Sequence, residues 1–217
     1  MSISINRIGY LSGVAASAAT VVYVVVQLLQ ISGTLRFPFD EILIYGSSFC
    51  IVVPFVFEIL SLHYLTEPNK RFWTHGALIF ATAYLVFVSS NYVVQLATII
   101  PAKLRGSIDD VRMFDQTPHS FFWDYDALGY ICMGLAALFA VPAVGKEGLE
   151  RRVRLALVIH AFVTPLIGAV YFYPAFTADL ILFLGLPWAF TAPTFMLLLG
   201  LMLQHKKATS IYEVDAS

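Results

Sequence analysis

Six long apolar runs divide the sequence, and they constrain the fold more than any other feature. Each is close to the roughly 20 residues that a helix needs to cross about 30 Å of hydrocarbon. In this chain of 217 residues the runs are about Ile8–Gln30, Ile42–Leu65, Trp73–Ile100, Ser120–Val144, Val153–Phe176 and Thr177–Gln204. We therefore expect an all-α integral membrane protein, with a single bundle of six transmembrane helices within residues 1–207 and a polar cytoplasmic tail over residues 208–217.

Composition supports this assignment and limits the partners. Hydrophobic residues make up 59% of the chain and charged residues only 12%, a balance that would leave a water-soluble fold with too much exposed apolar surface. The formal net charge of −1 argues against a nucleic-acid partner, because phosphate binding needs a basic surplus. The lipid bilayer is the expected partner, together with a small-molecule or lipid ligand. The oligomeric state is left open.

The distribution of basic residues predicts the orientation. Of the 13 Lys and Arg residues, nine fall in the connections on one side and four on the other. The smaller group is Arg36, Lys103, Arg105 and Arg112. Cytoplasmic loops carry the basic excess, so both termini are expected in the cytoplasm. No organelle signal is evident, and a multi-pass protein of the plasma membrane (the cell inner membrane) is the default expectation.

Polar residues inside the runs recur at helical spacing, so that each of four runs carries one polar stripe. Polar groups in hydrocarbon need partners or water, and they therefore usually face the interior of a bundle. This places a candidate binding site in a partly polar interior. Its residues are Glu58, Asn91, Gln95, Asp126, Tyr130, His160, Thr164 and Tyr171.

Two features sharpen the expected site. Glu58 and His160 each lie seven residues from the predicted cytoplasmic end of their helix, about 10 Å deep at 1.5 Å per residue, and could pair at that depth. Asp124 and Asp126 are two residues apart, so a helix directs them to nearly opposite sides. Only Asp126 is expected to face inward, while Asp124 suits the positive N-terminal end of its helix.

The aromatic residues near the predicted outer boundary are expected to form an interfacial belt rather than to line a ligand site. They are Phe121, Phe122, Trp123, Tyr125, Tyr171, Phe172 and Tyr173. His119, Asp124 and Asp179 do not have the spacing of a known metal site, so no metal is expected. No cofactor is expected either, and no catalytic residue can be assigned.

Three functional hypotheses follow. The first is a polytopic membrane protein that binds or conducts a small solute or proton through its polar interior. The second is a membrane-embedded enzyme that acts on a lipid or apolar substrate at the outer face, with Asp126, Asp124 or His119 as the acid or base. The third is a non-catalytic partner subunit. The sequence lacks the common hydrolase and nucleotide-binding signatures, which favours a protein that is not an enzyme.

Overall fold

The computed structural model describes residues 4–175, 177 and 180–206. All regular secondary structure in this part of the chain is helical, and six helices are long and apolar enough to cross a membrane. The main elements are α1 (Ile5–Ile31), α2 (Phe39–Tyr64), α3 (Arg71–Val94), α5 (Phe121–Ala140), α6 (Gly148–Phe172) and α8 (Leu186–His205). The prediction of six apolar helices is confirmed.

The third helical segment is longer than predicted. It runs without a break from Pro68 to Arg105, past the expected end at Ile100, by way of a π-helical turn η2 (Gln95–Ile99) and the short helix α4 (Ile100–Arg105). Pro101 lies in the first turn of α4, directly after the π-helical turn. Gly106 ends the helix in the left-handed conformation, with φ of 70°.

Short elements complete the chain at the ends of the long helices. The turn η1 (Pro68–Lys70) precedes α3, and η5 (Val141–Ala143) extends α5. Two 3₁₀ turns, η3 (Ile108–Asp110) and η4 (Arg112–Phe114), lie in the connection between α4 and α5. A second π-helical turn, η6 (Ile181–Gly185), precedes α8.

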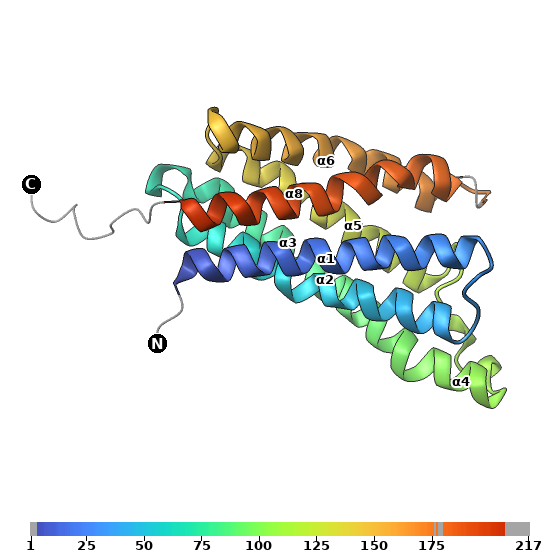
Figure 1. Ribbon diagram of the computed structural model, residues 1–217. Helices are drawn as coiled ribbons and strands as arrows, with labels where there is room; N and C mark the ends of the chain where they lie inside the picture. Colours follow the sequence, from blue (N-terminus) through green and yellow to red (C-terminus); the bar gives the residue numbers. More distant parts are fainter. Residues whose placement is uncertain (1–3, 176, 178–179, 207–217) are drawn as a thin grey trace, which may run out of the picture.

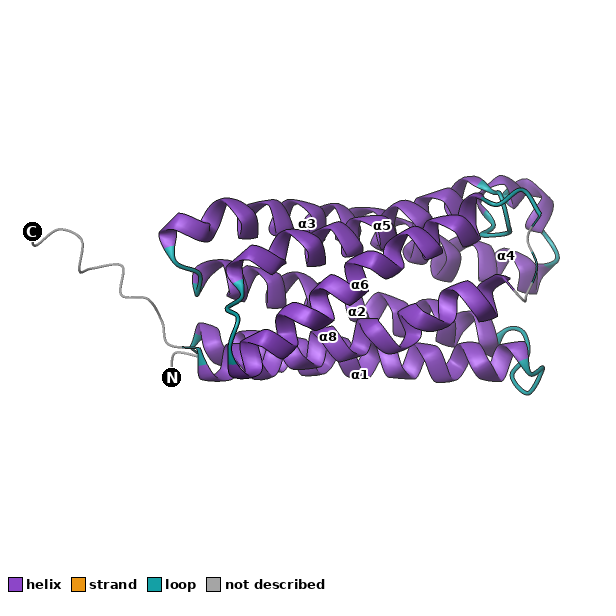
Figure 2. Cartoon of the chain, turned by 90° about the horizontal axis from the view of Figure 1, so that it is seen from above, coloured by secondary structure: helices purple, strands orange, loops and turns teal. Residues whose placement is uncertain are grey.

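The six long helices form a closed ring. In order around the ring, α1 packs against α2, α2 against α3, α3 against α5, α5 against α6, α6 against α8, and α8 against α1. Figures 1 and 2 both show α1 and α8 side by side, although they lie at opposite ends of the sequence. The interior of this ring holds the polar residues considered below.

The bundle has two distinct ends. At one, here called the terminal end, Asn6 of α1 donates a hydrogen bond to the carbonyl of Leu203 in α8 at 2.8 Å, so that the first and last helices are joined. At the other, the loop end, residues 106–120 connect α4 to α5, and Figure 1 shows α4 at this end. Both described ends of the chain therefore lie on the same side of the bundle.

The outward faces of the helices are apolar. Phe162, Phe72 and Phe183 are 76%, 74% and 72% exposed, and Phe190 is 67% exposed. In contrast, Asn91 and Gln95 are fully buried. A bundle surrounded by lipid is expected to have this arrangement, with apolar side chains on the outside and polar side chains inside.

Two glycines set the separation of α1 and α8 near the terminal end. A Cβ atom added to Gly13 would lie 2.7 Å from the Cα of Gly200 and 2.5 Å from Oε1 of Glu58. Neither the backbone of α8 nor the buried Glu58 side chain has room to accept it. The small residues thus allow the two backbones to approach closely.

We expect Gly13→Ala to destabilise the bundle by about 1–3 kcal/mol, because the methyl group forces α1 away from α8. The matched control is Gly46→Ala in α2, since a Cβ there would have no atom within 4 Å. Denaturant titration in mixed micelles measures both. Equal stability of Gly13→Ala and wild type would contradict the close α1–α8 packing.

Candidate functional site

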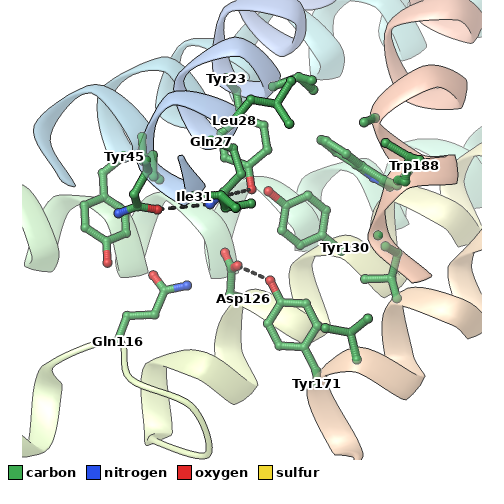
Figure 3. A pocket seen from close by; sticks show the side chains of 18 of the residues that line it. Tyr23, Gln27, Leu28, Ile31, Tyr45, Gln116, Asp126, Tyr130, Tyr171 and Trp188 are labelled. Carbon is green, nitrogen blue, oxygen red and sulfur yellow. Dashed lines mark hydrogen bonds between the residues drawn. The ribbon is translucent and has the colours of Figure 1, made fainter. Parts of the chain in front are cut away.

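A pocket of about 410 Å³ opens in the loop half of the bundle. Its walls come from the loop-end portions of α1, α2, α3, α5, α6 and α8, from η6, and from the loop at Gln116 and Pro118. Figure 3 shows the side chains that converge on it. The volume lies in the range of about 300–1,000 Å³ that is typical of small-molecule sites.

Asp126 supplies a buried acidic group to this pocket. It is 4% exposed and lies on α5 one turn from Tyr130. Tyr171 of α6 donates its hydroxyl to Oδ2 of Asp126 at 2.5 Å, and Asn91 of α3 donates its amide to Oδ1 at 3.4 Å. Both partners are donors, so they stabilise the ionised carboxylate. Figure 3 shows the hydroxyl of Tyr171 meeting the carboxylate at the wall of the pocket.

Asn91 and Gln95 lie behind Asp126 and fix the loop to the bundle. The amide of Asn91 also donates to Oε1 of Gln116 at 2.8 Å, and Gln95 Nε2 donates to the carbonyl of Phe114 at 2.8 Å. In return, the backbone N–H of Gln116 donates to Oε1 of Gln95 at 3.2 Å. The loop therefore supplies one wall of the pocket because two buried amides of α3 and η2 hold it there.

An ion-pair cluster fixes the same loop from its other side. Lys103 of α4 lies 2.9 Å from Glu41 of α2 and 3.0 Å from Asp115 of the loop. Glu41 lines the pocket, whereas Lys103 does not. The single ammonium group is shared between two carboxylates, so this cluster keeps one net negative charge.

Aromatic rings form a large part of the remaining wall. Trp188 of α8 packs edge-on against Tyr130 and Tyr23, with ring centroids 5.0 Å and 5.8 Å apart. Trp123 lies 4.6 Å from Tyr171, measured between centroids, and donates its indole N–H to the Tyr171 carbonyl. The full aromatic set is Tyr23, Tyr45, Tyr92, Trp123, Tyr130, Tyr171, Trp188 and Phe190. Edge-to-face packing of this kind holds the rings in defined positions.

The pocket reaches the apolar outer surface between α1 and α8. Leu28 and Ile31 of α1 and Leu186 and Phe190 of α8 line it, and these four side chains are 44–67% exposed. Toward the loop end the lining becomes polar, with Gln30 of α1, Glu41 of α2 and Gln116 of the loop. A molecule can therefore meet apolar groups on the side of the pocket and polar groups at its rim.

The predicted site residues fall into three places rather than one shared cavity. Asp126, Tyr130 and Tyr171 line the pocket, and Asn91 and Gln95 support Asp126 from behind. As predicted, Asp126 faces inward while Asp124 is exposed.

His160 lies apart from this pocket. It is 1% exposed, its Nδ1 lies 3.0 Å from the hydroxyl of Thr191, and its ring stacks at 4.5 Å on Phe195. Thr164, one turn away, donates to the His160 carbonyl at 3.4 Å and faces α5. This arrangement is that of a packed contact between α6 and α8.

Glu58 occupies the third place, at the crossing of α1 and α8. It is fully buried, and no described side chain lies within hydrogen-bonding distance of its carboxylate oxygens. The hypothesis that Glu58 pairs with His160 is wrong for this reason. The expected match in depth does not hold at the helix ends either, because Glu58 lies six residues from the end of α2 at Tyr64 and His160 lies twelve residues from the start of α6 at Gly148. The two side chains also face different helix contacts, and position along a helix says nothing of the angle around the bundle.

The prediction of an aromatic belt is wrong for two of its residues. Phe121, Phe172 and Tyr173 are exposed at the loop end as a belt requires, but Trp123 and Tyr171 line the pocket. Sequence reasoning missed several other lining residues, among them Tyr23, Tyr45, Gln116 and Trp188. Tyr23, Tyr45 and Trp188 belong to none of the predicted polar stripes, and Gln116 lies in a loop. Asp179 lies outside the described residues.

Comparisons with models of protein families, with curated proteins and with solved structures find no match to this chain.

We expect Asn91→Ala to destabilise the protein by about 1–3 kcal/mol, because it leaves polar atoms of Gln116 and Asp126 without a donor. Hydrogen exchange at Phe114–Pro118 should accelerate, since the loop loses an anchor. The control is Ser90→Ala, because Ser90 is exposed and bonds only to a backbone carbonyl of its own helix. Unchanged exchange in the loop of the Asn91 variant would contradict the anchoring role.

Proposed function

We propose that this protein is a multi-pass membrane protein that binds a small, largely apolar molecule in the pocket at the loop end. The observation that carries the proposal is the pocket itself, with an apolar opening between α1 and α8 and a buried carboxylate in its wall. A ligand with an apolar body and one polar group fits both features. As in the first hypothesis from the sequence, the protein would bind a small molecule in its interior. As in the second, that molecule would be largely apolar.

A donor in the pocket wall supports a ligand with a polar group. The indole Nε1 of Trp188 is buried and has no hydrogen-bond acceptor among the described residues. Buried N–H groups rarely remain without a partner, and leaving one unpaired costs about 1–3 kcal/mol. A ligand oxygen near Trp188 would satisfy it.

The terminal half of the bundle argues against passage through the protein. Phe55 lies between Tyr84 and Phe195, with centroids 5.5 Å and 6.0 Å away, and all three side chains are at most 1% exposed. Every residue that lines the pocket lies in the loop half. A site that ends at packed rings suits binding better than conduction.

The distribution of basic residues supports an orientation of the bundle in the membrane. Eight of the nine on the predicted inner side, from Arg7 to Lys206, belong to the described part of the chain and lie at the terminal end. The excess of basic residues there favours a cytoplasmic terminal end. The pocket would then lie in the outer half of the bilayer, open to lipid.

A membrane enzyme is the second candidate. The observation in its favour is the hydrogen bond from Tyr171 to Asp126 within a pocket of ligand size, since a carboxylate beside a hydroxyl can move a proton to or from a bound molecule. The two candidates differ in the fate of the ligand, which a binding protein releases unchanged.

A neutral, apolar aryl diazirine dissolved in the bilayer tests access to the pocket. On illumination it should label Tyr130, on the inward face of α5. Ala189→Trp fills the pocket wall and should reduce this labelling several-fold. Leu197→Trp adds the same side chain to the same helix at an exposed position outside the pocket and should leave it unchanged. Labelling confined to outward residues such as Leu128 in wild type would overturn the proposal.

A further inference from the structure

The ionisable residues that line the pocket all carry the same sign. Asp126 and Glu41 are the only Asp, Glu, Lys, Arg or His residues among the described residues of the lining, and no basic side chain reaches it. Lys103 pairs with Glu41 but also with Asp115, so it does not offset the charge of Asp126. The partners of Asp126, Tyr171 and Asn91, are neutral donors.

An anionic carboxylate without a cation is costly in a low-dielectric site, even when neutral donors hold it. A bound cation would lower this cost through direct Coulomb attraction, which is strong where water is excluded. An anionic ligand would raise it. The charge of the pocket thus distinguishes between the classes of ligand that its size and apolar opening admit.

The aromatic wall points to the same class. The hydroxyl of Tyr171 meets the carboxylate in Figure 3, the ring of Tyr130 lies next to that of Tyr171, and Trp188 packs against Tyr130. The faces of Trp and Tyr rings attract cations, and quaternary ammonium groups are recognised by cages of such rings. A carboxylate within an aromatic enclosure is a combination that suits an ammonium group better than a metal ion, which would need more oxygen ligands.

We propose that the ligand of this pocket is an amphiphilic amine, with its ammonium group against Asp126 and the rings of Tyr130, Tyr171 and Trp188, and with its apolar body directed toward the opening between α1 and α8. This inference rests on the proposed function, because it names the class of molecule that the same pocket takes. The pocket should therefore select for charge as well as for apolar character.

Three probes of similar size and different charge test it. They are phenylbutyl-trimethylammonium, its neutral isostere with a tert-butyl group in place of the trimethylammonium group, and the anion phenylbutylsulfonate. Tryptophan fluorescence of the protein in phosphatidylcholine nanodiscs reports binding, corrected for partition into empty nanodiscs. We expect the ammonium probe to bind at least about tenfold more tightly than the neutral one.

Substitutions test whether the preference for the ammonium probe comes from the pocket. Asp126→Asn should abolish the preference for the ammonium probe, whereas Asp124→Asn, an equal charge change on an exposed position of the same helix, should retain it. Tyr130→Leu should weaken binding of the ammonium probe more than binding of the neutral probe. Tyr130→Phe keeps the ring and should keep most of the affinity for the ammonium probe. Size-exclusion chromatography establishes that each variant is folded.

The outcomes separate this inference from the proposed function. If wild type binds the neutral probe as tightly as the ammonium probe, or binds the anion best, the inference that the ligand is an amine is overturned. The proposal that the pocket binds a ligand would still stand. Loss of the preference in Asp124→Asn also overturns the inference of an amine, because the charge would then act from outside the pocket. If none of the three probes binds above empty nanodiscs, the proposed function fails as well.

Discussion

The loop half of this protein depends on how the carboxylate of Asp126 is held among apolar helices. A carboxylate removed from water is destabilised by several kcal/mol unless donors compensate it. Tyr171 and Asn91 provide those donors from α6 and α3, so one side chain of α5 ties three helices together. Because Asn91 also holds Gln116, the same network fixes the loop that closes this end of the bundle.

The pocket follows from a difference between the two ends of the α1–α8 contact. Near the terminal end, Gly13 and Gly200 bring the two backbones together. Toward the loop end, the pocket is lined by Leu28 of α1 and Leu186 of α8. The pocket therefore lies between helices that are in direct contact nearer the terminal end. Large rings occupy its walls, and Asp126 provides its charge. The shape of the pocket therefore arises from small residues at one end of the α1–α8 contact and aromatic residues at the other, whereas Asp126 supplies the buried charge.

Helical periodicity explains what could be predicted. The spacing of Asn91 and Gln95, and the separation of Asp124 from Asp126, depend only on the 3.6-residue turn, and the structure places those side chains as that geometry requires. Contacts between helices need the angle of each helix around the bundle, which a single sequence does not contain. For that reason the sequence suggests a Glu58–His160 pair that the structure does not form. It also gives no signal for the loop contact of Gln116 or for the place of Trp188 in the pocket.

The most direct test is an experimental structure of the protein in lipid nanodiscs, determined with and without phenylbutyl-trimethylammonium. We expect difference density beside the carboxylate of Asp126, enclosed by Tyr130 and Trp188, with the phenyl group extending toward the opening between α1 and α8. A pocket without such density at saturating probe, or a probe bound only on the outer surface, would contradict this expectation.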